Sequence, residues 1–326
     1  MKKTIIGIDI SKDSLDYCFI DIASHRKTHF GKLENSKTAI DKWLNSLDLH
    51  QVEFAMEHTG HYGALLATLI SGHNASFYMI NPLDLKKSLG IQRGKTDVLD
   101  AYRIASFTIT NKHRLSTCKL PSKELGKIKV LMTARERYIK IAVQIKNSIK
   151  ANEILNKTLD VKDVIFQEKK QIKAVEKTIS FFESQMQSII NSSETLKTNY
   201  QKITKIIGVG QITAIKCIAE TDNFTKFTNP RKFCCHSGLA PFQYQSGTSI
   251  KGKTKTHYHR NRSLKAILFK ASGSAIQHDP QLKNYYNRKL NEGKHKLTVL
   301  NVVANKLVLR IFAVVKRDEP FVKLIA

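Results

Sequence analysis

The feature that most restricts the fold is a pair of long apolar series in the middle of the chain. Apolar side chains recur at spacings of three and four from Ile128 to Ile149, and again from Ile172 to Ile189. This spacing places them along one stripe of a helix and is typical of a coiled-coil seam. We therefore expect two long helices, joined near residues 152–162, that form an antiparallel arm or a dimerisation element.

Positive charge increases along the chain on either side of this segment. Lys and Arg number 54 against 27 Asp and Glu, a formal net charge of +27. Residues 1–115 hold 15 basic and 12 acidic side chains, a net +3, whereas residues 201–326 hold 23 and 6, a net +17. So many like charges repel one another unless a polyanion neutralises them. Nucleic acid is the expected partner, because the release of its counterions favours binding to a basic protein. A basic face that only keeps the protein soluble is the alternative.

Composition excludes several other classes of protein. With 41% apolar residues, 6 prolines and 15 glycines, the chain is neither disordered nor fibrous. We expect no membrane span and no secretory signal, and therefore a cytoplasmic protein. The five cysteines have the spacing of neither a disulfide framework nor a metal site, and we interpret Cys234-Cys235-His236 as helix packing.

The first 118 residues have the pattern of an α/β domain. Short apolar runs rich in β-branched residues alternate with amphipathic stretches. The first two runs predict a β-hairpin, and a third strand follows it. The predicted strands span residues 4–10, 14–22, 27–33, 52–58 and 76–81, and the predicted helices span residues 37–47, 60–73 and 96–108.

Four acidic residues stand at the ends of these elements. Asp9 ends the first strand among isoleucines, Glu57 ends a later strand, and Asp97 and Asp100 lie three apart on one face of a helix. An unpaired carboxylate beside a core requires a metal or a basic partner. This placement suggests a ribonuclease H-like (RuvC-like) arrangement, and four oxygen donors without His or Cys suit Mg²⁺ or Mn²⁺.

A structural interpretation of the same acids is equally open. In this interpretation they are four ordinary acids among 27, with Asp97 capping its helix and Asp100 pairing with Arg103 or Lys95. Spacing alone does not separate the two interpretations.

Several motifs give the chain a family resemblance. GIDISKDSLDY, AMEHTGHYG and RGKTDVLDAYRIA, followed by KIIGVGQITA, FCCHSGLAP and YQSGTSIKG, resemble the DEDD transposases of bacterial insertion sequences. That group includes the pilin-gene inverting recombinase Piv. The resemblance covers nearly the whole chain. It implies a ribonuclease H-like catalytic domain over residues 1–118, the helical arm over residues 119–199, and a mainly α, basic transposase domain over residues 200–326.

The resemblance also implies the catalytic residues. The acidic tetrad maps onto Asp9, Glu57, Asp97 and Asp100, and the serine nucleophile of the C-terminal domain maps onto Ser246. Attack by a hydroxyl on phosphorus conserves the bond energy as a phosphoserine–DNA ester. Ser249 is the alternative position for this nucleophile, and without the family Ser246 is an ordinary turn or phosphate-contact residue.

Other residues are candidates for nucleic-acid contact. Two glycines separated by one residue between helical stretches form a tight turn whose amides can face a phosphate. A basic loop with interleaved Tyr258 and His259 can grip a backbone and stack bases, although a solvated loop is the alternative. The predicted contacts are Lys95, Gly208, Gly210, Lys251, Lys253, Lys255, Arg260 and Arg262.

The resulting functional expectation is an insertion-sequence transposase or recombinase. The family implies double-stranded target and donor DNA, a noncoding guide RNA from the element itself, and a homo-oligomer, either a dimer or a tetramer. One rival is a Holliday-junction-type endonuclease that uses the same acids to activate water. The other is a nucleic-acid-binding protein without catalytic activity.

Overall fold

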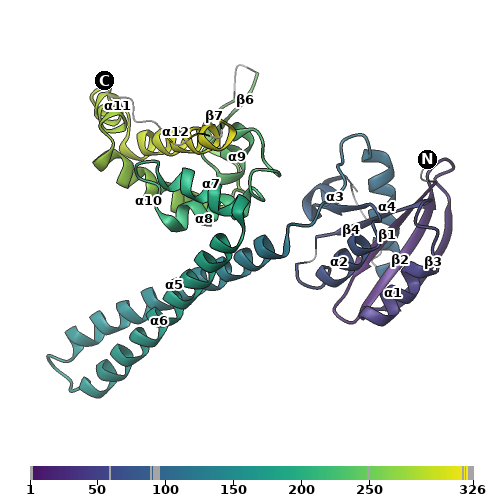
Figure 1. The fold of residues 1–326 in the computed structure, drawn as a ribbon, viewed down its shortest axis with the longest axis horizontal. Helices are drawn as coiled ribbons and strands as arrows, with labels where there is room; N and C mark the ends of the chain where they lie inside the picture. The colour runs from purple at the N-terminus through teal and green to yellow at the C-terminus, as the bar shows by residue number, and fades with distance from the viewer. Residues whose placement is uncertain are drawn as a thin grey trace. The chain divides into compact units, whose positions relative to one another are not determined.

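The chain folds into two compact units, Met1–Leu120 and Pro121–Ala326 (Figure 1). The structure is a computed structural model that describes residues 3–58, 60–88, 90, 96–247, 250–317, 319 and 321. Each unit has hydrophobic clusters of its own. The functional division of the chain at residues 118 and 199 stays a prediction.

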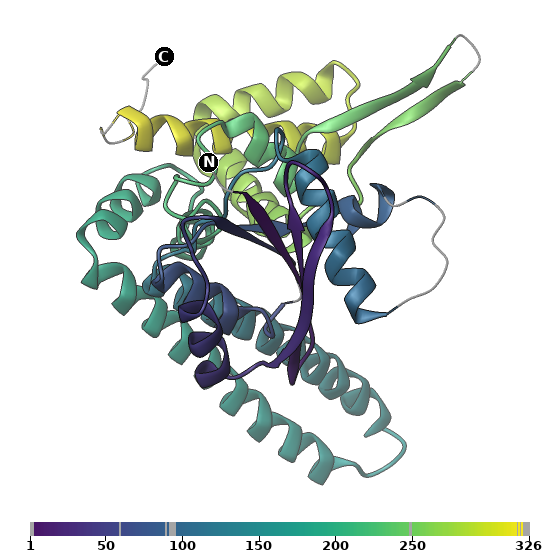
Figure 2. The same ribbon diagram turned by 90° about the vertical axis from the view of Figure 1, so that its right-hand side faces the viewer.

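The N-terminal unit is built on a mixed five-stranded sheet in the order β3-β2-β1-β4-β5 (Figure 2). β1 pairs antiparallel with β2, and β2 with β3, whereas β1 and β4, like β4 and β5, run parallel. This confirms the expected mixed α/β architecture. The elements are β1 (Thr4–Ile10), β2 (Ser14–Asp21), β3 (Lys27–Glu34), α1 (Lys37–Asn45), β4 (Val52–Glu57), α2 (Ala64–Gly72), β5 (Phe77–Ile80), α3 (Pro82–Ser88) and α4 (Asp97–Asn111).

The alternation of side chains along β1 assigns the two faces of the sheet. Ile6 and Ile8 belong to the core cluster that also contains the buried residues of α1 and α2. Ile5 belongs to the cluster that contains the buried residues of α4. Because successive side chains in a strand point to opposite faces, Gly7 and Asp9 share the α4 face with Ile5.

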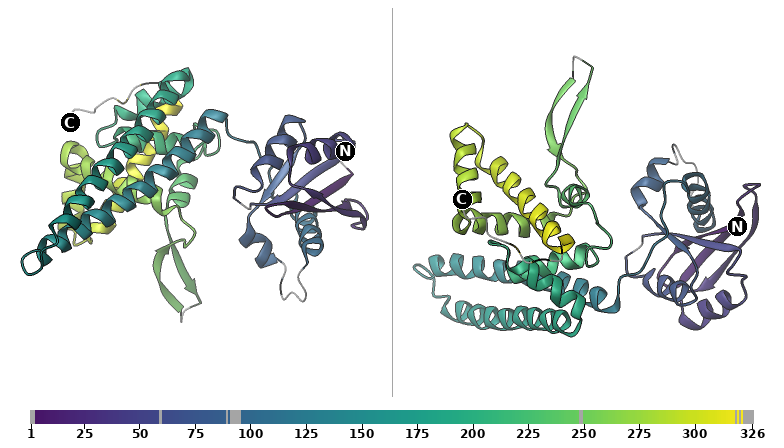
Figure 3. Two further views of the ribbon diagram at one scale, coloured as in Figure 1. Left: turned by 90° about the horizontal axis from the view of Figure 1, so that it is seen from below. Right: turned by 45° about the horizontal axis from the view of Figure 1, so that its top comes forward.

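Two long antiparallel helices open the C-terminal unit: α5 (Lys123–Leu155) and α6 (Lys162–Ser192) (Figure 3). Their direction follows from the ion pairs between them, Lys146 with Glu176 at 2.7 Å and Lys169 with Glu153 at 2.8 Å. The predicted apolar stripe lies between them and is buried at Ile128, Met132, Ala142, Ile149, Ile172 and Met186. A supercoil of these helices stays a prediction.

The rest of this unit is a helical core from which one β-hairpin projects (Figures 1 and 3). β6 and β7 pair only with each other in the part of the chain that the structure describes. The elements are α7 (Glu194–Thr204), α8 (Gln211–Glu220), α9 (Pro230–Ser237), β6 (Pro241–Ser246), β7 (Ile250–Thr256), α10 (Arg262–His278), α11 (Pro280–Asn291) and α12 (Lys296–Arg317).

Helix α12 corrects one expectation from the sequence. Among the described residues it is the one helix long and apolar enough to cross a membrane, whereas no such stretch was expected. Its residues Val303, Leu307 and Ile311 have no exposed surface and pack in the helical core. Burial inside the protein covers 44% of this apolar stretch, while Leu297, Val302 and Leu309 stay exposed.

Candidate active site

A glycine in the middle of β1 sets how closely α4 approaches the sheet. A Cβ atom at Gly7 would lie 2.1 Å from the carbonyl oxygen of Ala101 and 2.6 Å from the amide nitrogen of Ala105. No side chain fits in this space, so the backbone of α4 packs directly on the strand. At the far end of the helix, Lys112 forms an ion pair with the buried Glu53 of β4.

The four predicted acids form one electrostatic group at the other end of α4. Burial and, after it, the charges of Asp100, Asp97 and Glu57 together raise the pKa of Asp9 from 3.8 to about 6. The strand pairing explains the position of Glu57, because Ile8 of β1 pairs with Met56 of the parallel strand β4. The sheet and α4 thus bring together carboxylates that are up to 91 positions apart in sequence.

The structure tests the structural roles that were the alternative for Asp97 and Asp100. Thr96 caps α4, its hydroxyl oxygen accepting from the amide of Leu99 at 3.3 Å, so Asp97 is not the capping residue. Asp100 does pair with Arg103, at 2.7 Å. Arg103 is largely buried and offsets part of the negative charge, yet the pKa of Asp9 is still raised.

The four carboxylates are suitable ligands for a hard divalent cation, although their side chains are not arranged around a single ion in this structure. All four groups are carboxylates, the ligands that Mg²⁺ and Mn²⁺ prefer. Within the described residues, however, no three acidic, His or Cys side chains are placed to hold one ion between them. The pKa of Asp9 is raised first by burial and then by the three neighbouring carboxylates, so both its environment and its neighbours disfavour its charged form. A cation entering this site would have to draw the carboxylates together.

The predicted serine lies at the end of the projecting hairpin. Ser246 is the last residue of β6 and pairs with Ile250 of β7, and Gly247 follows it with φ of +57°. The left-handed backbone at this position favours glycine. The backbone of Lys251, Lys253 and Lys255 occupies alternate positions of β7. The alternative Ser249, and the predicted contact Lys95, lie outside the described residues.

One carboxylate connects the two ends of this hairpin. Glu220 of α8 lies 3.3 Å from His236 Nε2, just before the hairpin, and its Oε1 accepts from Asn261 Nδ2, just after it, at 2.9 Å. Lys216 Nζ, in a residue that is 7% exposed, lies 3.2 Å from Glu220 and donates to Glu136 of α5 at 2.9 Å. Burial raises the pKa of Glu220, but the His236 hydrogen bond and the Lys216 charge outweigh it and bring the pKa to about 2. This polar network was not foreseen, because its members are scattered over the sequence.

The two arginines after the hairpin have different environments. Arg260 packs against Gly238, where a Cβ atom would lie 2.2 Å from the arginine Cδ, and it donates to the His257 carbonyl at 3.2 Å. Arg262 lies 5.5 Å from the centroid of the Tyr258 ring, and that tyrosine is 72% exposed. Arg260 thus contributes to packing at the base of the hairpin, whereas Tyr258 and Arg262 present an accessible aromatic and cationic pair.

The two-glycine turn between α7 and α8 has a packing role in addition to any contact with phosphate. Gly208 has φ of +90°, and a Cβ atom there would lie 2.6 Å from the Ala275 side chain of α10. Gly210 is exposed and precedes the first residue of α8. In the neighbouring α9, Cys234 is buried in the helical core, in keeping with its interpretation as a packing residue.

Comparison with known proteins places the chain in a family. A DEDD transposase model matches residues 6–158, and a model of the transposase IS116/IS110/IS902 family matches residues 200–287. The chain belongs to the DEDD transposase family of bacterial insertion sequences. This transposase is 26% identical to the pilin gene-inverting protein of Moraxella lacunata over 99% of both chains. It is 22% identical to the transposase for insertion sequence element IS1111A of Coxiella burnetii, over 97% of this chain and 91% of that one.

A solved structure also resembles part of the transposase. T. thermophilus RuvC, in a complex with a Holliday junction substrate, aligns with 36% of this chain and 99% of its own, at 11% identity and a TM-score of 0.30. A score this low does not by itself establish a common fold. The sequence comparisons identify the protein as a DNA transposase or recombinase.

Proposed function

We propose that this transposase cuts and exchanges DNA strands through a divalent-metal acidic site and a serine nucleophile. In this proposal the N-terminal unit is a ribonuclease H-like domain, and Asp9, Glu57, Asp97 and Asp100 hold Mg²⁺ or Mn²⁺. Ser246 forms a covalent bond to DNA. The observation that carries the proposal is the raised pKa of Asp9, caused by burial and by the other three carboxylates. Structural acids are normally arranged with cations, not with each other.

The proposed chemistry assigns separate tasks to the two units. When bound, a divalent cation neutralises charge on the reacting phosphate and lowers the pKa of an attacking hydroxyl. The acids hold and orient the cation, and the hairpin presents Ser246. The serine oxygen forms a bond to phosphorus while the bond from phosphorus to the sugar oxygen breaks, and the departing oxygen takes up a proton. A sugar hydroxyl of the other strand then attacks the phosphoserine and releases the serine.

The partners in this proposal follow from charge and from the family. The +17 net charge of residues 201–326 supports binding to the phosphates of target and donor DNA. We further propose that a noncoding RNA of the element selects these sites by base pairing, and that two duplexes are held by a cytoplasmic homo-oligomer, either a dimer or a tetramer. The exposed pair Tyr258 and Arg262 offers a stacking surface for unpaired bases.

Recombination between two plasmids that carry the ends of the element tests the catalytic proposal. The reaction contains Mg²⁺, with or without RNA transcribed from the flanking DNA, and is scored both for recombinant junctions and for protein covalently joined to DNA. Asp9→Asn should abolish both products. Ser246→Ala should abolish both as well, while the matched variant Ser249→Ala retains them.

Other outcomes would favour the rival functions. If Ser246→Ala still cleaves DNA, the enzyme is a hydrolase of the Holliday-junction type that activates water. If Asp9→Asn leaves every product unchanged, the acids have no catalytic role. If Ser249→Ala and not Ser246→Ala removes the covalent product, the nucleophile is the other serine of the same loop.

A further inference from the structure

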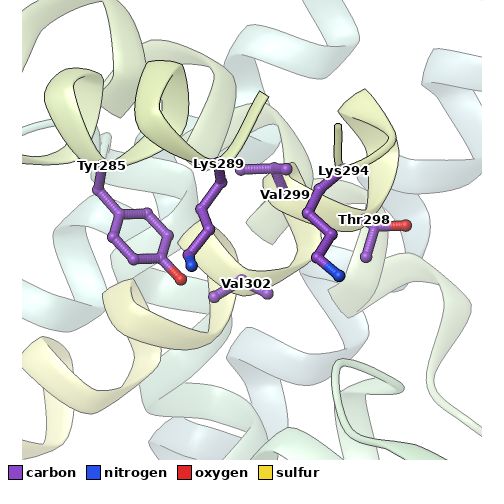
Figure 4. Close-up of a pocket in the computed structure, with 6 residues that line it drawn as sticks. All are labelled: Tyr285, Lys289, Lys294, Thr298, Val299 and Val302. Carbon is purple, nitrogen blue, oxygen red and sulfur yellow. The ribbon is translucent and has the colours of Figure 1, made fainter. Parts of the chain in front are cut away.

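A small cavity opens between α11 and α12, away from the hairpin and its anchoring network. It has a volume of about 250 Å³ and is lined by Tyr285, Lys289, Lys294, Thr298, Val299 and Val302 (Figure 4). Five of these six residues lie beyond residue 287, where the second family model ends. The family match therefore gives no role to this part of the chain.

The exposed surface of the lining is mostly apolar, and two lysines and two hydroxyl residues contribute its polar part. In Figure 4 the side chain of Lys289 points toward the Tyr285 hydroxyl, whereas that of Lys294 lies across the cavity from them, near Thr298. Val299 and Val302 supply the apolar part of the wall. Ammonium and hydroxyl groups donate to anionic oxygens, and the valines offer a surface for carbon atoms. The lining thus suits a ligand with an anionic end and a less polar body.

The charge of the surrounding helices favours an anion. Residues 280–317 contain nine Lys and Arg and a single acidic residue, Glu292. The pKa of Glu292 is lowered by its hydrogen bond from Lys289 and by the charges of Lys289, Arg288 and Lys294. Among the described residues, Lys294 has no carboxylate within ion-pair distance. Glu292 forms an ion pair with Lys289, and Arg310 of α12 forms one with Asp279, so the positive charge that stays available at the cavity is that of Lys294.

The size of the cavity limits what it can accept. At about 250 Å³ it is smaller than the roughly 300–1,000 Å³ of typical ligand pockets. It has room for about one sugar–phosphate unit and not for a dinucleotide cofactor. Its chemistry also matches that unit, which has a phosphate at one end and a sugar of mostly carbon at the other.

We propose that this cavity is a subsite for one sugar–phosphate unit of a nucleic-acid strand. The phosphate lies against Lys294, and the sugar lies against Val302 and Val299, whereas Lys289 is held in an ion pair with Glu292 at 2.5 Å. The inference rests on the nucleic-acid partner of the proposed function but not on its catalytic residues. It assigns a nucleic-acid contact to the last two helices, which are distant in sequence from the basic hairpin.

Binding measured by fluorescence anisotropy tests this subsite with the full-length protein. The probes are a labelled DNA duplex, oligothymidine and oligouridine of equal length. Lys294→Ala should weaken binding of at least one probe about tenfold, as expected for loss of a charge-assisted hydrogen bond. It should also reduce the slope of log K against log salt by about one. The matched control is Lys283→Ala, an exposed lysine of α11 outside the cavity.

A second pair of variants consists of one that fills the cavity without changing its charge and one that serves as its control. Val302 is 37% exposed, and Val302→Phe should weaken binding several-fold by occupying the space for the sugar. Leu309, two turns further along the same helix and 42% exposed, provides the control Leu309→Phe, which should bind like the wild type. A loss confined to the duplex and oligothymidine assigns the subsite to DNA, and a loss confined to oligouridine assigns it to RNA.

Three results would overturn the inference. Equal losses in Lys294→Ala and Lys283→Ala would mean that only the general positive field matters. Unchanged binding by Val302→Phe would mean that the cavity is not occupied. A wild-type protein that binds none of the probes would overturn both the subsite and the nucleic-acid partner, whereas failed recombination with intact binding would contradict only the catalytic proposal.

Discussion

Replacing Asp9 with asparagine should stabilise the N-terminal unit, and only at a pH where the carboxylate is ionised. The folded unit raises the pKa of Asp9 from 3.8 to about 6, so the folded state holds this proton more tightly than the unfolded state does. Stability is therefore lost as the pH rises from about 4 to about 6. Two pKa units at about 1.4 kcal/mol each set an upper limit of about 3 kcal/mol, and solvent screening of this partly exposed carboxylate makes the gain for Asp9→Asn at pH 8 smaller than that limit, with no gain near pH 4.

The chain provides a local probe for this measurement. Its single tryptophan, Trp43, lies in the N-terminal unit, with ring centroids 4.9 Å from Tyr17 and 5.8 Å from Phe54. Urea denaturation followed by Trp43 fluorescence in EDTA thus reports on this unit. Added Mg²⁺ should stabilise the wild type at pH 8 and not Asp9→Asn, because the variant lacks one of the proposed ligands.

A matched control comes from the strand next to β1. Asp16 pairs directly across from Asp9 but forms an ion pair with Lys32 at 3.2 Å, so Asp16→Asn should destabilise the unit. The reasoning is refuted if Asp9→Asn is less stable than the wild type at pH 8. A gain of equal size at pH 4 and pH 8 would refute it as well, because the gain would then not arise from charge.

Three further substitutions test contacts that stabilise α4 and the base of the hairpin. Gly7→Ala should destabilise the N-terminal unit by about 1–3 kcal/mol or more, since α4 must move away from β1, and Trp43 fluorescence should show an earlier urea transition. Thr96→Ala should cost about 1 kcal/mol in the same assay by removing the cap of α4, and an unchanged midpoint would contradict that role. Glu220→Gln should destabilise the C-terminal unit at neutral pH, as followed by circular dichroism. Its effect should decrease as the pH falls from about 4.5 toward 2, where the wild-type carboxylate gains its proton.

The sequence was sufficient to predict the strands of the N-terminal unit, all of its helices except α3, and the helical pair that follows. The short runs around Ile6 and Phe54 are apolar and bounded by polar residues, and the first is rich in β-branched residues, which is typical of buried strands. The apolar stripe from Ile128 to Ile149 identified α5 by its helical spacing. In each case a local pattern of apolar residues identifies the element.

The parts that sequence did not reveal depend on contacts between distant segments. Glu220, His236 and Asn261 belong to no common motif, and only the fold brings them together. A glycine inside a strand often marks the close approach of another backbone, so Gly7 is the one position whose sequence indicates that α4 packs directly on β1. The membrane-like composition of α12 shows the opposite difficulty, because an apolar helix has the same sequence pattern whether protein or lipid covers it.

The anchoring of the hairpin by Glu220 has a mechanical consequence. A six-residue strand at about 3.3 Å per residue makes β6 a lever about 20 Å long, so a tilt of about 10° at its base moves its tip by about 3 Å. Catalytic groups lose much of their efficiency when displaced by about 1 Å. Under the proposed function, the position of Ser246 would depend on a carboxylate a full strand length away, and a substitution at Glu220 would reduce strand exchange although Glu220 does not contact DNA.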